Sequence, residues 1–220
     1  VSAGIRRPLQ DLEIEFDKFA ASLADEDTIS MGRKIETMRS SIRQLTELQS
    51  YLEDSKALQS EELVLQLESV SLNDLADEVS SVMQPFASKY SVKLRLEQAA
   101  EEAVIQIDRL KFVRVLVNLM SNAIKFSPAG SEVVLRILNT QEDVVFEVVD
   151  SGQGIPKENL ESIFGAFKQV SNDDSANNKG FGLGLAICKR IVDAHKGEIV
   201  VISEMGKGSL FRIILKAPKV

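Results

Sequence analysis

Residues 109–126 restrict the possible folds more than any other segment, because their helical spacing comes with apolar side chains on almost every side. A helix that is apolar nearly all round is stable only when other elements cover it. Three polar side chains interrupt this surface. Asn118, Asn122 and Lys125 are spaced i, i+4 and i+7, so they share one stripe of the helix. The segment therefore predicts a buried helix with a single polar stripe.

This polar stripe predicts a polar ligand or a polar protein partner. Buried amide and ammonium groups without hydrogen-bond partners lower the stability of a fold. Amide carbonyls suit Mg²⁺, and an ammonium suits phosphate. A stripe that merely faced water would explain the amphipathic pattern, but it would not explain two asparagines inside a helix.

Strand patterns surround the buried helix from Leu63 onward. They cover residues 64–70, 92–96, 104–107, 133–138, 144–149, 199–202 and 210–215. Further helices are expected over 184–195 and after Ser71, where Asp74 three residues on completes a variant of the capping box. The pattern predicts that residues 61–220 form an α/β sandwich of the α+β class, with one helical layer on one mixed sheet.

Residues 1–60 have a purely helical pattern. Two runs of apolar residues at spacings of three and four are separated by an acidic turn at 25–28. They predict an antiparallel helical hairpin. Because such a hairpin leaves half of each apolar stripe uncovered, we expect two copies to form a dimeric four-helix bundle. The alternative is a monomeric hairpin packed on the rest of the chain.

Composition narrows the classes of function. The chain has 26 Lys and Arg against 33 Asp and Glu, and its net charge of -7 disfavours non-specific binding to nucleic acid or anionic lipid. One Cys excludes an intrachain disulfide, and one His excludes a His-rich metal site. With no apolar run near the ~18 residues of a membrane span, a cytoplasmic location is expected. Since the sequence begins at Val1 rather than Met, any membrane anchor would lie upstream.

An acidic residue and two glycines follow the strand pattern at 144–149. Asp150 stands at the strand's end, and Gly152 and Gly154 precede Ile155. A carboxylate at this place can accept a hydrogen bond from an amine, and the glycines allow the backbone to turn beneath a ligand. Alone, this pattern is also that of an ordinary turn.

A second glycine motif opens the helix expected over 184–195. Gly180, Gly182 and Gly184 alternate and lead into that helix, whose free amides and dipole favour an anion. The alternation is not G-x-G-x-x-G and no strand directly precedes it, which excludes a dinucleotide fingerprint. The P-loop pattern G-x-x-x-x-G-K-[ST] is absent from the sequence.

Taken together and in this order, the motifs are specific. They are Asn118-x-x-x-Asn122-Ala-x-Lys125-Phe126, Asp150-x-Gly152-x-Gly154-Ile155, Ile163-Phe164-x-x-Phe167 and Gly180-x-Gly182-Leu183-Gly184-Leu185. This series resembles the N, G1, F and G2 boxes of the ATP-binding domain of sensor histidine kinases. The resemblance runs from about Leu63 to the end, where residues 206–211 look like the glycine-rich start of the family's final strand.

The resemblance implies a Bergerat-type ATP site. Asp150 would accept a hydrogen bond from the adenine amino group, Asn118 would ligate Mg²⁺, and Asn122 and Lys125 would approach the phosphates. Residues 157–179 would form the ATP lid. The nucleotide-binding set implied for this chain is Asn118, Asn122, Lys125, Phe126, Asp150, Gly152, Gly154, Ile155, Phe164, Phe167, Gly180, Gly182, Leu183, Gly184 and Leu185.

The resemblance breaks at the start of the hairpin. The family's first helix usually carries Ser-His-Glu-Leu-Arg-Thr-Pro-Leu, whereas residues 2–9 read Ser-Ala-Gly-Ile-Arg-Arg-Pro-Leu. Ala3 therefore stands at the phosphoacceptor position and Gly4 at the acidic position beside it. Arg7 stands where a Thr or Asn serves phosphatase activity. We expect the chain to bind Mg-ATP without forming phosphohistidine on the hairpin.

The single histidine does not replace the missing acceptor. His195 is expected at the C-terminal end of the helix over 184–195, where a cation is favourable, so a structural role is the stronger interpretation. Cys188, on the same helix, is expected to be a small packed or half-exposed residue.

Two histidine-kinase interpretations remain open. In the first, the chain is a natural pseudokinase that modulates a partner kinase or a response-regulator receiver, as a homodimer or as a heterodimer with an active kinase. In the second, it is an active kinase whose acceptor was engineered to Ala3. Gly4 and Arg7 favour natural degeneracy, because they are not obvious engineering choices.

A third interpretation comes from another class of proteins. It is an ATPase of the superfamily that includes DNA gyrase, mismatch-repair proteins and chaperones. Those enzymes place a general-base Glu just ahead of the N-box Asn, whereas Val117 precedes Asn118 here.

Overall fold

The computed structural model describes residues 63–99, 103–166, 168 and 182–217. The hairpin expected over 1–60 lies outside this range, together with Ala3, Gly4, Arg7, Phe167 and Gly180, and the boundary between 60 and 61 stays a prediction. The elements are β1 (Glu68–Ser71), α3 (Leu72–Lys89), β2 (Lys93–Glu97), β3 (Val104–Ile107), α4 (Arg109–Phe126), β4 (Glu132–Asn139), β5 (Asp143–Asp150), a 3₁₀ turn (Lys157–Asn159), α5 (Gly184–Ala194), β6 (Glu198–Glu204) and β7 (Gly208–Lys216). None of the helices in these ranges has the apolar length that a membrane span requires.

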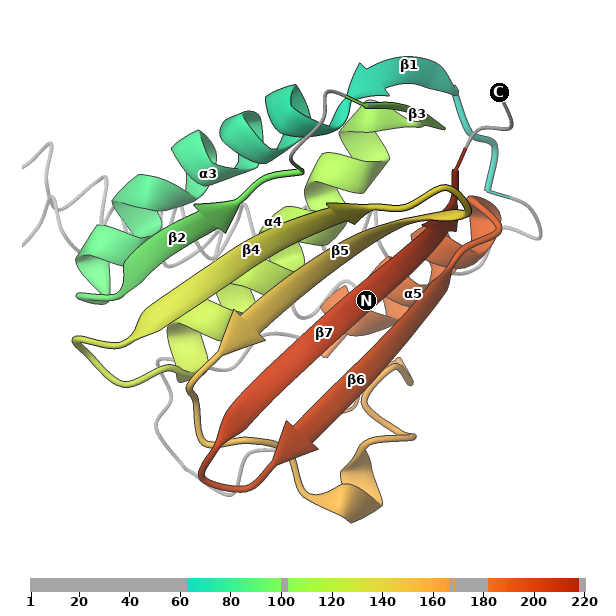
Figure 1. Cartoon of the computed structure of the whole chain (residues 1–220). Coiled ribbons are helices and arrows are strands. Elements are labelled where there is room, and N and C mark those ends of the chain that lie inside the picture. The colour runs from blue at the N-terminus through green and yellow to red at the C-terminus, as the bar shows by residue number, and fades with distance from the viewer. Residues whose placement is uncertain (1–62, 100–102, 167, 169–181, 218–220) are drawn as a thin grey trace, which may run out of the picture. The chain divides into compact units, whose positions relative to one another are not determined.

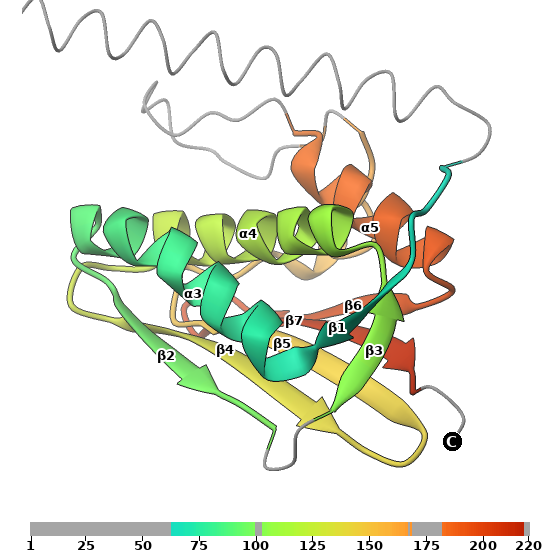
Figure 2. The same cartoon turned by 90° about the horizontal axis from the view of Figure 1, so that it is seen from above.

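Two sheets replace the single mixed sheet that the sequence predicted. The larger has the order β2-β4-β5-β7-β6, in which β2 and β4 are parallel and the other neighbours are antiparallel. Figure 1 shows these strands side by side, and Figure 2 shows α3, α4 and α5 together on one side of them. β1 and β3 pair only with each other. β1 leads directly into α3, and only Asp108 separates β3 from α4.

Helix α4 is the centre of the core, as its apolar sequence predicted. Its buried side chains are Phe112, Val115, Leu116, Leu119, Met120, Ala123 and Ile124. Phe112 packs against Phe146 of β5 with ring centroids 4.9 Å apart. The helix begins after Asp108, whose Oδ1 accepts a hydrogen bond from the Lys111 N–H at 3.1 Å. Burial of this helix holds the polar stripe in a defined place above the sheet.

The strand predicted over 64–70 begins later than expected, at Glu68. Its partner β3 supplies only four residues, and Glu68 already pairs with Ile107, the last of them. The next residue, Asp108, leaves the sheet to cap α4, and its Oδ2 accepts the Gln66 N–H at 3.0 Å. The prediction for residues 64–67 was therefore wrong, because no strand remains for them to pair with. The predicted cap of α3 is confirmed, since Ser71 Oγ accepts the Asp74 N–H.

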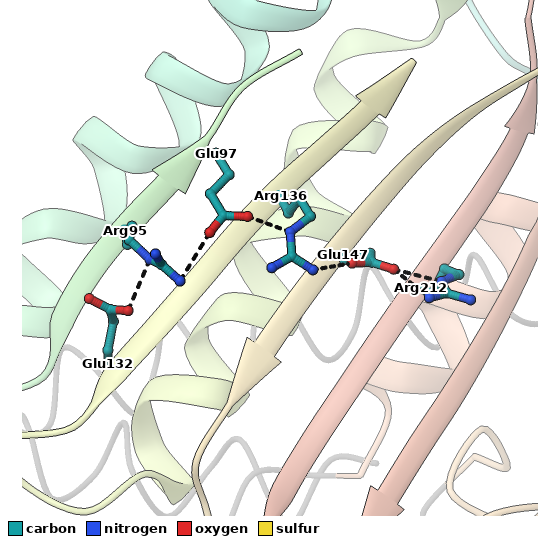
Figure 3. A network of polar contacts seen from close by, with 6 residues as sticks. All are labelled: Arg95, Glu97, Glu132, Arg136, Glu147 and Arg212. Carbon is teal, nitrogen blue, oxygen red and sulfur yellow. Dashed lines mark hydrogen bonds and ion pairs between the residues drawn. The ribbon is translucent and has the colours of Figure 1, made fainter. Parts of the chain in front are cut away.

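The face of the large sheet away from the helices carries a row of ion pairs (Figure 3). Glu97, Arg136, Glu147 and Arg212 are neighbours on β2, β4, β5 and β7. The Glu147 side chain is 3% exposed and lies between Arg136 Nη1 at 2.9 Å and Arg212 Nη2 at 2.6 Å. Arg136 also pairs with Glu97. The sheet thus has an apolar inner face and a charged outer face.

Candidate functional site

The polar stripe of α4 is present as predicted. Asn118, Asn122 and Lys125 are all half-buried. Asn122 Nδ2 donates to Asn118 Oδ1 over a long distance of 3.4 Å. Lys125 forms no ion pair with the part of the chain that the structure describes. Among the described residues, most of the hydrogen-bonding capacity of these groups is therefore unused and could serve a ligand.

Helix α5 begins directly against this stripe. A Cβ atom on Gly184 would lie 2.3 Å from Asn118 Nδ2, so any side chain there would have to displace the Asn118 amide. The N-cap residue Leu183 forms no side-chain cap. The first N–H groups of α5 thus lack a capping side chain at a point next to the Asn118 amide, and such a helix start favours an anion.

Asp150 stands at the end of β5 and is 7% exposed. Its Oδ1 accepts two backbone hydrogen bonds, from the Gly152 N–H at 2.8 Å and the Ser209 N–H at 3.2 Å. Burial raises the pKa of this carboxyl above its usual range, although the two N–H donors oppose the shift. Because both bonds end on Oδ1, Oδ2 can accept a hydrogen bond from a ligand.

The loop after β5 lies against the other end of α4. A Cβ atom on Gly152 would be 2.7 Å from the Phe126 carbonyl oxygen. Gly154 has a φ of +76°, and a Cβ atom there would lie 2.2 Å from the Glu204 carbonyl oxygen. Asn118 and Phe126 are about 12 Å apart along the helix axis at 1.5 Å per residue. The loop after β5 and the start of α5 therefore lie at opposite ends of the polar stripe, where Gly152 and Gly184 contact α4.

Two serines complete the surroundings of Asp150, and sequence reasoning missed both as site residues. Ser209 of β7 is the register partner of Asp150 on one side and of Ser203 of β6 on the other. Ser203 Oγ accepts the Ile155 N–H at 2.8 Å. The available signal was two serines at either end of the glycine-containing turn 204–208, since residues opposite each other in a hairpin must meet.

The segment predicted as a lid is described only in part. It starts with the 3₁₀ turn Lys157–Asn159. Ile163 is buried, whereas Phe164 is half-buried. In the described part of this segment, Ile163 rather than Phe164 is therefore the apolar residue packed into the domain. At the other end, Leu183 is buried, Leu185 is half-buried and Gly182 has a φ of +69°.

Cys188 belongs to the core, and the half-buried His195 packs against Phe112 of that core. His195 Nε2 accepts the Asp108 N–H at 3.0 Å, and Nδ1 lies 2.7 Å from the Ile191 carbonyl oxygen. This arrangement requires a neutral ring with its proton on Nδ1. The role is structural, as expected, but it does not use a cation. Burial raises the pKa of the Cys188 thiol to about 12, which leaves it unreactive.

Known proteins resemble this chain in sequence. A family model for histidine kinase-, DNA gyrase B- and HSP90-like ATPases matches residues 107–219. The adaptive-response sensory kinase SasA of Synechococcus sp. (strain JA-3-3Ab) is 32% identical over an alignment of 208 residues, which covers 89% of this chain and 54% of that relative. The chain thus spans about half the length of this curated relative.

Solved structures share the fold. Full-length ShkA in complex with AMPPNP has a TM-score of 0.74 at 24% identity, over 96% of this chain and 46% of that one. Histidine kinase ThkA in complex with the response regulator protein TrrA has a TM-score of 0.72 at 24% identity, over 99% of this chain and 60% of that one.

The family match covers the elements that carry the site, from the end of β3 through β7. The match to SasA, at 32% identity over 89% of this chain, agrees with a domain of the histidine-kinase type. The chain therefore belongs to the family of histidine kinase-, DNA gyrase B- and HSP90-like ATPases, with an ATP-binding domain of the sensor histidine kinase type.

Proposed function

We propose that this chain is the core of a two-component sensor histidine kinase that binds Mg-ATP and forms no phosphohistidine on its own hairpin. One observation gives the main support for the nucleotide site. The buried carboxylate of Asp150 and the start of α5 lie at opposite ends of the α4 polar stripe, where Gly152 lies against the Phe126 backbone and Gly184 against the Asn118 side chain. A carboxylate at one end and unpaired N–H groups at the other suit an amine-bearing base and a phosphate chain.

The residues fit adenine and the phosphates. Asp150 Oδ2 would accept from the adenine amino group, while Oδ1 stays bonded to the Gly152 and Ser209 N–H groups. Lys125 and the first N–H groups of α5 would bind phosphate oxygens.

The residues also fit Mg²⁺. The described residues contain no cluster of three or more His, Cys, Asp or Glu that could hold a metal by themselves. Mg²⁺ commonly takes one or two protein oxygens beside phosphate oxygens and water. The Asn118 carbonyl oxygen would supply such a ligand, and bound Mg²⁺ would neutralise phosphate charge.

The hairpin carries the second half of the proposal. Ala3 has no nucleophilic atom, and Gly4 cannot take a proton from an attacking imidazole. A chain with an intact nucleotide site and no acceptor would act as a nucleotide-gated modulator, as a homodimer or as a heterodimer with an active kinase. ThkA is seen with a response regulator, which supports a receiver domain as the partner.

Calorimetric titration with a non-hydrolysable ATP analogue tests the nucleotide site. We expect binding by the parent that strengthens with Mg²⁺, and weaker binding by Asn118→Ala in which the Mg²⁺ dependence is reduced. Absence of binding by the parent would contradict the proposal. Sustained release of ADP from ATP would instead support an ATPase of the gyrase type.

Restoring the acceptor tests the hairpin. The parent and Ala3→His are incubated with ATP labelled at the γ-phosphate, and phosphoimidazole is measured. We expect no label on either, because Gly4 leaves the restored imidazole without its proton acceptor. Label on the parent would contradict the proposal, whereas label on Ala3→His alone would favour an engineered but otherwise active kinase.

A further inference from the structure

The turn between β6 and β7 is bonded to the loop that follows Asp150. The Gly206 N–H donates to the Gln153 carbonyl at 2.8 Å, and the Ile155 N–H donates to Ser203 Oγ at 2.8 Å. Gly154 lies against the Glu204 carbonyl, with no room for a Cβ atom. Among these three contacts, the Ser203 hydroxyl is the one supplied by a side chain.

The Ser203 hydroxyl has all of its hydrogen-bonding capacity in use. Its Oγ accepts from Ile155, and its hydrogen is directed to the Gly208 carbonyl oxygen at 2.8 Å. Ser209 Oγ lies 3.0 Å away. Since the single hydrogen of Ser203 goes to Gly208, Ser209 must be the donor in this third contact. One hydroxyl group therefore joins the loop at Ile155 to Gly208 and Ser209 of β7, and Ser209 is the register partner of Asp150.

The same hydroxyl is connected to Asp150 through the sheet register. Asp150, Ser209 and Ser203 are successive partners on β5, β7 and β6. The Ser209 N–H holds Asp150 Oδ1, which also accepts the Gly152 N–H. A change at Ser203 thus reaches Asp150 along two routes, through Ser209 and through the loop from Ile155 back to Gly152.

We infer that Ser203 is a positioning residue for the nucleotide site. It holds the loop Gly152–Ile155 on the β6–β7 turn and thereby keeps Asp150 Oδ2 directed toward the ligand. Ser203 acts through Ile155 and Ser209, so its loss lowers nucleotide affinity without removing a group that contacts adenine. This inference rests on the proposed nucleotide-binding function.

The test compares Ser203→Ala, Ser203→Thr and a matched control, Thr140→Ala. Thr140 also uses its hydroxyl within a turn, bonding the Asp143 N–H and carbonyl at 2.9 Å each, but it lies at the opposite end of β5 from Asp150. We expect Ser203→Ala to raise the Kd for a non-hydrolysable ATP analogue by about fivefold to tenfold, the effect of one lost hydrogen bond. Ser203→Thr should restore affinity, and Thr140→Ala should leave it unchanged.

Amide hydrogen exchange on the nucleotide-free proteins gives a second readout. We expect faster exchange at Ile155 in Ser203→Ala, but not in Ser203→Thr or Thr140→Ala. Equal Kd values for the parent and Ser203→Ala, or equal loss of affinity in Thr140→Ala, would overturn this inference while leaving the nucleotide site in place. No binding by the parent would overturn the proposed nucleotide-binding function, and with it the expected effect of Ser203 on affinity.

Discussion

The two ends of the site are built differently. Around Asp150, backbone N–H groups, two serine hydroxyls and a tight hairpin form a continuous set of hydrogen bonds within the protein. At the α4–α5 end, the two asparagines share one long hydrogen bond, and Gly184 sits against Asn118 without a capping group. The carboxylate end is therefore organised before a ligand arrives, whereas the α4–α5 end leaves its polar groups for the ligand to satisfy.

This difference follows from the elements that supply each end. Asp150 lies at the end of the central strand β5, which is paired with β7 and through it with β6, so its neighbours are fixed by register. Asn118 and Asn122 project from a helix whose backbone groups bond to one another. Their side-chain amides therefore find hydrogen-bond partners only in neighbouring side chains or in a ligand. Changes at the two ends should consequently have different signatures.

The largest effect is expected at the preorganised end. Asp150→Asn replaces an ionised acceptor by an amide and should weaken binding of a non-hydrolysable ATP analogue by about 100-fold, as for a hydrogen bond to a charged group. Calorimetry measures this loss. The matched control is Asp143→Asn, at the other end of β5, where the carboxylate pairs with exposed Lys216. Similar losses in both variants would contradict the assignment of Asp150.

The second effect tests the contact between α4 and α5. Gly184→Ala introduces a Cβ atom that would lie 2.3 Å from Asn118 Nδ2 and must displace that side chain. We expect about tenfold weaker binding. In an Asn118→Ala background the same substitution should cost little more, because the displaced amide is already absent. A double-mutant cycle measures the coupling, and additive losses would show that Gly184 acts independently of Asn118.

The third effect is on stability and involves neither end of the site. Glu147→Ala leaves Arg136 and Arg212 without their shared carboxylate, but these arginines are 33% and 37% exposed and can be rehydrated. We expect a loss of about 1–2 kcal/mol in the free energy of unfolding, measured by urea denaturation, with unchanged nucleotide affinity. Glu97→Ala, at a more exposed point of the same row, should lower stability less.

The smallest effect is a pH dependence. Burial raises the pKa of Asp150 in the folded state, so ionising this carboxyl costs stability as the pH rises through the raised value. Asp150→Asn should therefore be more stable than the parent at neutral pH. The difference should vanish below about pH 3.9, where the carboxyl is protonated in both folded and unfolded chains. Thermal unfolding at several pH values, without nucleotide, tests this, and a less stable variant at neutral pH would contradict it.

Sequence patterns predicted much of the fold. The boundaries of α4 agree with its apolar run, and the strand patterns at 104–107 and 144–149 fall within β3 and β5. The separation of β1 and β3 from the main sheet could not be predicted, because strand pairing depends on where the connections lead in space. The row of ion pairs on the outer face was also missed, since its members lie on four strands far apart in the sequence.

The site was predicted in its polar and glycine residues but not in its supports. Asn118, Asp150 and Gly184 stand out because their residue types conflict with their local pattern: amides in an apolar helix, a carboxylate after an apolar strand, a glycine at a helix start. Ser203 and Ser209 do not stand out, because serines beside a turn are common. They lie beside Asp150 because the strand register pairs Ser209 with Asp150 and Ser203 with Ser209.

By itself, the sequence determined that the chain has a buried helix with one polar stripe and two glycine motifs after it, and that Ala3 stands where an acceptor histidine is expected. Each of these conclusions depends only on residue types and their spacing within a single segment. The tertiary structure decided that Gly184 abuts Asn118 and that Gly152 abuts Phe126. It also decided that Ser203 holds the loop at Ile155 and that Ser209 holds the Asp150 carboxylate. Such contacts join segments distant in the chain, so their geometry exists only once strands have paired and helices have packed.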